Sequence, residues 1–296
     1  MRRIAVLNQK GGVGKTTTTV NLAAGLAAEG HRTLILDLDP QAHATLHLGL
    51  LPGRSGPSLY EVLTQSTPLE KVRREVAPNL FLCGSHIDLA GAELELLGTV
   101  GREVILRDLL EADTESFDFV FMDCPPSLSV LTLNALCAAR EVLIPLQAHF
   151  LALHGLSKLL ETINLVSKRV NRDLRVAGVL LCLYDAGTRL GGEVIDDLDR
   201  FFDARRNPTA PWADAKLFQT RIRRNIRLAE CPSFGQSIFQ YAASSRGAED
   251  YASLAAEIQG RAPAAIWLAE GPPSKIEMPG DRAASSLDEA AAVFPV

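Results

Sequence analysis

The stretch Lys10-Gly11-Gly12-Val13-Gly14-Lys15-Thr16-Thr17 decides the fold because of what flanks it. It follows a short apolar run, residues 4–7, and precedes a helix-like segment, residues 20–28. Glycines let the backbone turn tightly and bring its N–H groups against phosphate oxygens, and the positive end of the following helix attracts the same charge. The sequence therefore predicts a phosphate-binding loop between a strand and a helix.

The loop matches the general pattern G-x-x-x-x-G-K-[ST] with one departure. Gln9 stands where the first glycine belongs, and a second lysine, Lys10, is added. The pattern predicts that Lys15 reaches the terminal phosphates and that the Thr16 hydroxyl binds magnesium. Lys10 is hard to satisfy on the nucleotide that Lys15 already holds. We therefore expect Lys10 to reach the nucleotide of a second copy of the chain.

Two further apolar runs end in aspartates. Residues 33–36 lead into Asp37 and Asp39, and residues 119–122 lead into Asp123. Ligands of open parallel sheets bind at the carboxyl ends of the strands. Any one of these aspartates alone is more typical of a turn or a cap, but together with the loop they predict a site for phosphate and magnesium.

On these residues the sequence resembles the deviant-Walker ATPases, the family of ParA, Soj, MinD and the nitrogenase iron protein. In that family the extra lysine crosses the dimer interface to the partner's nucleotide. The resemblance implies that Lys10, Lys15 and Asp39 are catalytic, with Asp39 orienting the attacking water. It implies a magnesium site at Thr16, Asp37 and Asp123. The residues it implies for ATP are Lys10, Gly11, Gly12, Val13, Gly14, Lys15, Thr16, Thr17, Asn225 and Pro232.

The rest of the chain predicts an α/β fold. Short Val, Ile and Leu runs alternate with longer amphipathic segments, which is typical of a parallel sheet covered on both faces. Further strands are expected at residues 142–146 and 176–183, and a helix at 153–170. We therefore predict a P-loop doubly wound, mostly parallel sheet with helices on both faces.

One domain accounts for most of the chain. The 296 residues, 47% of them hydrophobic, can bury a sizeable core without a second domain. We assign residues 1–260 to the ATPase domain. Residues 261–296, where Ala, Pro, Gly, Ser and acidic residues prevail, are expected to form a flexible C-terminal tail.

The formal net charge of −5 argues against a protein that is basic overall but allows a local basic patch. Residues 221–227 carry four arginines, which we call the basic run. Such a run is most often a solvated face. In the family that the chain resembles, the corresponding stretch serves both the nucleotide pocket and a DNA surface, and its usual proline is here Arg223. The DNA-binding residues implied are Arg224, Arg227, Arg189 and Arg246.

Several classes of protein are excluded by composition. The five cysteines form no C-x-x-C pair, and the histidines show no ligand spacing, which argues against a disulfide framework, an iron–sulfur cluster or a metal centre built from them. The sequence shows no signal peptide and no apolar run long enough to cross a bilayer. Residues 285–296 contain no Lys or Arg, unlike the basic membrane-binding helix of MinD. We expect a cytoplasmic, nucleoid-associated protein.

The resemblance implies a slow ATP hydrolase that dimerises around ATP and Mg²⁺, binds double-stranded DNA nonspecifically, and segregates DNA with a ParB-type partner that stimulates hydrolysis. Two alternatives stay open. The first is a related ATPase that positions a protein cargo such as a chemotaxis cluster or a cellulose-synthesis complex. The second is a nucleotide-binding scaffold or regulator with negligible turnover.

Overall fold

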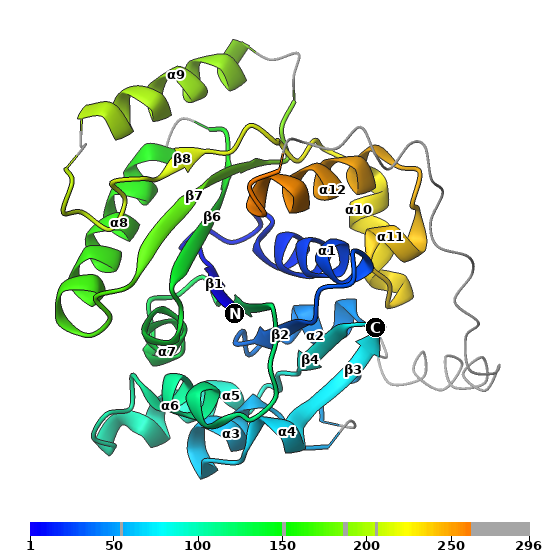
Figure 1. Ribbon diagram of the computed structural model, residues 1–296, viewed down its shortest axis with the longest axis vertical. Coiled ribbons are helices and arrows are strands. Elements are labelled where there is room, and N and C mark those ends of the chain that lie inside the picture. Colours follow the sequence, from blue (N-terminus) through cyan, green and yellow to red (C-terminus); the bar gives the residue numbers. More distant parts are fainter. Residues whose placement is uncertain (54–55, 150–151, 186–188, 205–206, 262–296) are drawn as a thin grey trace, which may run out of the picture. The chain divides into compact units, whose positions relative to one another are not determined.

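The computed structural model describes residues 1–261 except 54–55, 150–151, 186–188 and 205–206 (Figure 1). These residues belong to a single compact unit. The predicted tail lies, apart from Arg261, outside the described residues, so the division at residue 260 stays a prediction.

The described residues form one eight-stranded sheet in the order β3-β4-β2-β5-β1-β6-β7-β8. All neighbouring strands pair in parallel except β3 and β4, which are antiparallel. This confirms the predicted mostly parallel sheet. The strands are β1 Arg2–Val6, β2 Thr33–Asp37, β3 Arg73–Ala77, β4 Leu80–Cys83, β5 Phe119–Asp123, β6 Glu141–Gln147, β7 Arg175–Cys182 and β8 Lys216–Leu217.

Helices cover both faces of the sheet (Figure 1). One face carries α3, α5, α6, α7, α8 and α9, and the other carries α1, α10, α11 and α12. The α-helices are α1 Lys15–Ala28, α2 His43–His47, α3 Leu59–Gln65, α4 Leu69–Val72, α5 Leu89–Glu95, α6 Ile105–Ala112, α7 Val130–Ala138, α8 Ala152–Arg169, α9 Arg189–Ala204, α10 Ile226–Glu230, α11 Ile238–Tyr241 and α12 Arg246–Ile258. Two 3₁₀ turns are η1 Leu96–Gly98 and η2 Cys231–Phe234.

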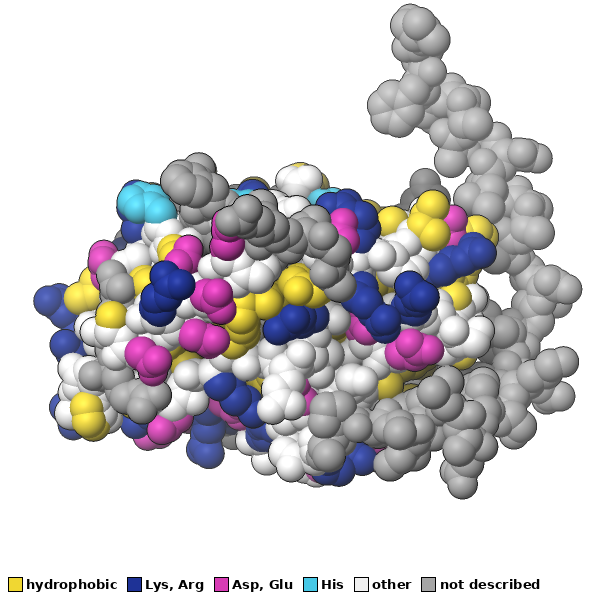
Figure 2. Space-filling model, turned by 90° about the horizontal axis from the view of Figure 1, so that it is seen from above, with side chains coloured by type: hydrophobic (Ala, Val, Ile, Leu, Met, Phe, Trp, Pro, Cys, Tyr) yellow, Lys and Arg dark blue, Asp and Glu magenta, His cyan; other side chains and the backbone are white. Residues whose placement is uncertain are grey.

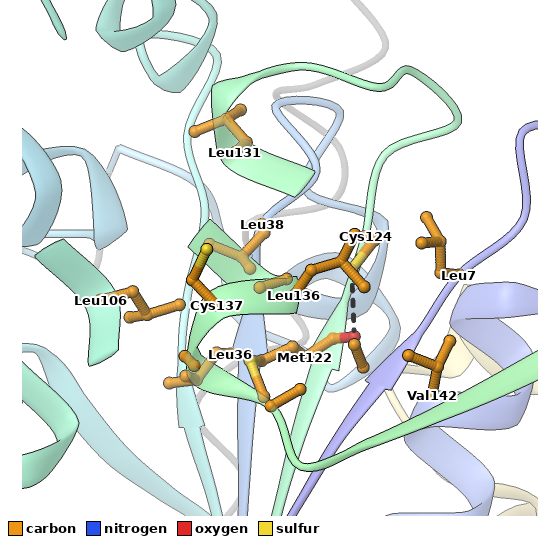
Figure 3. Close-up of a cluster of buried hydrophobic side chains, with 14 of the residues drawn as sticks. Leu7, Leu36, Leu38, Leu106, Met122, Cys124, Leu131, Leu136, Cys137 and Val142 are labelled. Carbon is orange, nitrogen blue, oxygen red and sulfur yellow. Dashed lines mark hydrogen bonds between the residues drawn. The ribbon is translucent and has the colours of Figure 1, made fainter. Parts of the chain in front are cut away.

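The central strands read as continuous apolar runs because both of their faces are buried. Along β1, Ala5 packs into the cluster under α7 and α8, whereas Ile4 and Val6 pack into the cluster under α1 and α12. Figure 3 shows part of the first cluster, where Leu36 of β2 and Met122 of β5 lie beside Leu136 of α7. Packing on both faces leaves the carboxyl ends of the strands as the place where polar side chains gather.

Sequence patterns located β1, β2, β5, β6, β7 and α8, but missed the antiparallel edge made by β3 and β4 and the two-residue strand β8 at the other edge. The short strand β3 is half-buried or exposed along its length and carries charged residues, as edge strands often do. Its Arg73 forms ion pairs with Asp113 and Glu115 and lies over the ring of Phe117. The edge is therefore fixed by partners about 40 residues further along the chain, which local patterns do not reveal.

Residues 207–215 pack back onto the fold beside β7. The Val176 N–H donates to the Pro211 carbonyl oxygen over 2.7 Å, and Trp212 packs against the core cluster under α8 and α9. In the part of the chain that the structure describes, every helix is too short or too polar to qualify as a membrane span.

Candidate functional site

The phosphate loop joins the end of β1 to α1 and owes its shape to two glycines. Gly12 and Gly14 adopt φ values of 73° and 95°, in the left-handed region that side chains with a Cβ rarely enter. Gly14 is the N-cap of α1, and a Cβ added there would lie 3.4 Å from the Cβ of Cys182. Open space lies beside Gly11 and Gly12. The loop therefore presents bare backbone at a helix N-terminus, as anion binding requires.

The two lysines of the loop differ in how far they are buried. Lys15 is 7% exposed, and its Nζ donates to the Lys10 carbonyl oxygen over 3.2 Å. Burial lowers the pKa of Lys15, although Asp123 and Asp39 act in the opposite direction. Lys10 is exposed. Its backbone N–H donates to the Oδ1 of Asn8 over 3.0 Å. One amine thus belongs to the buried site and the other faces outward.

Asp123, at the end of β5, is joined to two hydroxyls of α1. Thr16 Oγ1 donates to Asp123 Oδ2 over 2.7 Å, and Thr19 Oγ1 donates to Asp123 Oδ1 over 3.1 Å. The predicted partners Thr16 and Asp123 therefore lie together. A hydroxyl and a carboxylate in this arrangement are the oxygen donors that suit a magnesium shell.

Asp37, at the end of β2, is fully buried and accepts from α2. Thr45 donates to its Oδ2 twice, from the backbone N–H over 2.8 Å and from Oγ1 over 2.7 Å. The Asp39 N–H donates to Asp37 Oδ1 over 3.2 Å, and Asp39 itself, 8% exposed, accepts from the Gln41 N–H. The segment after β2 is thus organised around the predicted carboxylates.

The protein compensates the ionised forms of the buried carboxylates Asp37 and Asp123 only in part. Asp37 and Asp123 occupy paired positions on neighbouring strands. Burial, with the charge of Asp37, raises the pKa of Asp123 to about 8. Burial, with the charge of Asp39, raises the pKa of Asp37 to about 6. Such shifts mark a site that a bound cation would relieve. The donor set, Thr16 with two aspartates, fits magnesium in the company of phosphate oxygens.

The residue at the start of α2 has an unusual backbone conformation. Ala42 adopts φ 54° and ψ 33° as the N-cap of α2. A residue with a Cβ costs about 1 kcal/mol in this left-handed region. The fold therefore holds the turn between the aspartate segment and α2 in a conformation that glycine would adopt more readily.

The basic run lies beside the carboxyl end of β7. The Arg224 N–H donates to the Tyr184 carbonyl oxygen over 3.2 Å, and Tyr184 follows two residues after Cys182, the neighbour of Gly14. Within the run, Arg223 binds Asp250 of α12 through Nε and Nη2. Arg221 lies over the ring of Tyr184 and donates to its hydroxyl. These two arginines are held by the fold.

The four arginines predicted to bind DNA have different surroundings. Arg224 is exposed, and among the described residues its guanidinium has no hydrogen-bond or ion-pair partner. Arg227 is exposed but pairs with Glu230 over 2.8 Å. Arg246 is exposed at the first turn of α12. The side chain of Arg189, at the start of α9, lies outside the described residues. Figure 2 shows basic and acidic side chains interspersed on the face in view.

Asn225 and Pro232, predicted to bind nucleotide, lie just before α10 and in η2. Asn225 caps α10 by accepting from the Arg227 N–H over 2.8 Å, and Pro232 lies in the first turn of η2. The 3₁₀ turn η2 packs against α2. The structure therefore links both residues to the aspartate segment through α2, and their contact with nucleotide stays a prediction.

Sequence patterns missed the residues that hold the site residues in place. Thr19 lies three residues after Thr16, a helical spacing that points to the same face. Asn8 directly precedes the loop, and its Nδ2 donates to the Pro145 carbonyl oxygen over 2.7 Å. Thr45 carries no local signal, because its role depends on how α2 folds back on β2.

The chain matches the family model described as an AAA domain over residues 1–176. The chromosome-partitioning ATPase Soj of Thermus thermophilus is 46% identical over 263 residues, which are 88% of this chain and 96% of that protein. The chromosome partitioning protein ParA of Myxococcus xanthus is 41% identical over 261 residues, 88% of each chain.

A solved structure agrees in fold. The cobyrinic acid a,c-diamide synthase from Mycobacterium smegmatis, determined with a bound ATP analogue and magnesium, has a TM-score of 0.69 and 37% identity over 83% of this chain and 98% of that one. The name of that protein describes a different activity from those of the two partitioning relatives, which are more similar to this chain in sequence. The phosphate loop, the mostly parallel sheet and the similarity to these relatives show that the chain belongs to the Soj/ParA family of chromosome-partitioning ATPases.

Proposed function

We propose that the chain binds ATP at the phosphate loop and hydrolyses it to ADP and phosphate. Lys15 and the loop N–H groups hold the phosphates, and Asp39 positions the attacking water. Bound Mg²⁺, held by Thr16 and supported by Asp37 and Asp123, would supply positive charge at the phosphate oxygens. The observation that carries the proposal is that Thr16 Oγ1 lies 2.7 Å from Asp123 Oδ2 beside the buried Lys15.

ATP is proposed to lie between two copies of the chain. Lys10 is exposed, and its backbone is fixed by Asn8, so its amine is available to a neighbouring molecule. Lys15 serves the nucleotide of its own chain from a buried position. Each nucleotide is then held by amines from both protomers, so dimerisation and nucleotide binding depend on each other.

The dimer is proposed to bind duplex DNA without reading sequence and to act on the nucleoid. Arg224, Arg227, Arg189 and Arg246 are the candidates, and two copies of each double the charge available to the phosphates. Release follows hydrolysis, which a ParB-type DNA-binding partner stimulates. The low basal rate follows from a site that needs a second protein to complete or rearrange it.

Turnover measurements with one variant test this function against its alternatives. Wild type should hydrolyse Mg-ATP slowly and speed up when DNA and the ParB-type partner are added together. Asp39→Ala should bind ATP and lose about 100-fold in turnover, the usual contribution of a residue that handles the proton of the attacking water. The control is Asp197→Asn, a change on the exposed face of α9.

Two outcomes separate the alternatives. A nucleotide-binding scaffold would show no stimulated rate and no loss in Asp39→Ala. An ATPase that positions a protein cargo would keep stimulation by DNA but take a cargo-bound protein, rather than a centromere-binding one, as its partner. Pull-down of centromere DNA with the partner distinguishes cargo positioning from DNA segregation.

A further inference from the structure

Helix α2 stands between the aspartate segment and the basic run. Its Thr45 donates two hydrogen bonds to Asp37, so the helix is tied to the end of β2. Its last residue, His47, lies with Nε2 3.4 Å from the Sγ of Cys231, the first residue of η2. The two residues are 184 positions apart in the sequence. One short helix thus touches the nucleotide site at one residue and η2 at another.

The contact between His47 and Cys231 is buried and neutral. His47 is 2% exposed and Cys231 is fully buried. Burial lowers the pKa of His47 to about 4, and a hydrogen bond with the backbone of Gln236 acts in the opposite direction. Burial raises the pKa of Cys231 to about 11. Near neutral pH an uncharged imidazole therefore meets a protonated thiol.

Two glycines bring the backbones of the same segments together. Gly49, two residues after the end of α2, and Gly235, directly after η2, both have positive φ, 78° and 64°. A Cβ on Gly235 would lie 2.9 Å from the Cα of Gly49, which real structures do not allow. The two segments therefore touch without room for adjustment, and close-packed contacts of this kind move together rather than deform.

The other end of the connection is the basic run. Cys231 directly follows α10, whose first turn carries Arg227 and whose N-cap is Asn225. Because α10 is short and continues into η2, Cys231 lies about one helical turn after Arg227. Arg227 is further held by Glu230, which also accepts from the Tyr241 hydroxyl.

We propose that His47 and Cys231 form a joint that couples the nucleotide state at Asp37 and Asp39 to the placement of Arg224 and Arg227. His47 acts as a positioning residue in this joint, since it is buried and acts through Cys231. The proposal rests on the proposed function, because it assumes that nucleotide binds beside Asp37.

Hydrogen exchange tests the joint without requiring DNA. Amides of residues 226–241 are compared in the full-length protein with Mg²⁺ and either a non-hydrolysable ATP analogue or ADP. Wild type should show exchange about fivefold slower with the analogue, within the usual range of coupling between sites. Cys231→Ala should lose this difference. Cys231→Ser, which keeps a hydrogen-bonding group beside His47, should retain most of it.

A matched control is Cys137→Ala, which removes another buried thiol, from α7 on the opposite face of the sheet. It should leave the nucleotide-dependent difference unchanged. Thermal unfolding of each variant identifies any that fails to fold. If Cys231→Ala fails to fold, Cys231→Ser and His47→Gln test the proposal instead. Cys231→Ser is expected to keep the nucleotide-dependent difference in exchange, and His47→Gln is expected to reduce it. The proposal would be overturned if the exchange difference between the ATP analogue and ADP were equal in wild type and in the variants of His47 and Cys231, or if wild type showed no such difference.

DNA binding gives a second, separable readout. The ratio of DNA affinities with the ATP analogue and with ADP should fall about fivefold in Cys231→Ala and stay unchanged in Cys137→Ala. If wild type shows the exchange difference but binds no DNA, the joint stands and the DNA-binding part of the proposed function fails. If the exchange difference persists in Cys231→Ala, the joint fails whatever the protein does with DNA.

Discussion

The phosphate loop and the basic run lie at the same edge of the sheet but use their charges in opposite ways. In the loop region, Lys15, Asp37 and Asp123 are buried and surrounded by fixed donors and acceptors, yet their charges are incompletely balanced. In the basic run, Arg223 and Arg227 are already paired with carboxylates of the same chain. An unbalanced buried site is prepared for a ligand, whereas a balanced exposed run is partly committed to the fold.

This contrast shows why a charge run in a sequence overstates a binding surface. Arg223 binds Asp250, whose side chain is 8% exposed, so its guanidinium serves the packing of α12. Arg224 is the member of the run whose exposure and surroundings leave it best placed for a phosphate backbone. The contrast therefore predicts a ranking among residues that the sequence presents as equivalent.

The largest expected effect is at the two lysines of the loop. Lys15→Ala should weaken ATP binding by about 100-fold, because it removes a buried charged donor from the phosphates. Lys10→Ala should leave ATP binding by a single chain within about threefold, because its amine faces outward. Titration with a fluorescent ATP analogue at low protein concentration measures both. Equal losses in the two variants would remove the distinction between an inner and an outer lysine.

The basic run offers a sharper test of the same contrast. Arg224→Ala should lower the slope of log affinity against log salt by about 2, since a dimer would lose two phosphate contacts. Arg227→Ala should change this slope less, because the guanidinium of Arg227 already forms an ion pair with Glu230. Arg224→Ala with Arg227→Ala should weaken DNA binding without changing ATP affinity. Electrophoretic retardation of arbitrary duplexes at several salt concentrations measures these effects.

Releasing Arg227 from its partner should act in the opposite direction. Glu230→Gln frees the guanidinium for phosphate and should tighten DNA binding. Asp197→Asn is the matched control, because Asp197 forms the same three-residue-spaced pair with Arg200 on α9. If both variants change DNA affinity equally, only net charge matters and the basic run has no special place.

The smallest expected effect concerns the pH dependence of stability without nucleotide or magnesium. The pKa of Asp123 is raised in the folded state. Between the ordinary pKa of an aspartate, which applies to the unfolded chain, and a pH of about 8, the folded protein therefore binds more protons than the unfolded chain. Stability is therefore gained as pH falls through about 8 and lost as pH rises. The unfolding temperature should rise by about 3 °C per pH unit from pH 8.5 to 6.5.

The choice of window isolates Asp123. Below pH 6.5 the lowered pKa of His47 works against stability, because the unfolded chain then binds the extra proton. Asp123→Asn should flatten the dependence between pH 8.5 and 6.5, and saturating Mg-ATP should do the same in wild type. A flat profile in nucleotide-free wild type would show that the carboxylates are balanced within the protein.

The sequence predicted the parts of the site that depend on local pattern. Glycines spaced around Lys15 and apolar runs that end in Asp37 and Asp123 specify a loop and strand ends, and the sheet then brings them together. Contacts between residues far apart in the sequence could not be predicted from it. Which arginine is paired depends on Asp250 of α12, and the neighbour of His47 is Cys231, so both follow only from how helices pack on the sheet. The antiparallel strands β3 and β4 were missed for the same reason.

The central claim is that ATP is held by amines from two chains, and a mass measurement tests it most directly. Asp39→Ala, saturated with Mg-ATP, should elute in light-scattering chromatography at about twice the single-chain mass of 32.0 kDa. Adding Lys10→Ala to this variant should return it to a single chain while ATP stays bound. A single-chain mass for Asp39→Ala under saturating Mg-ATP would contradict the account.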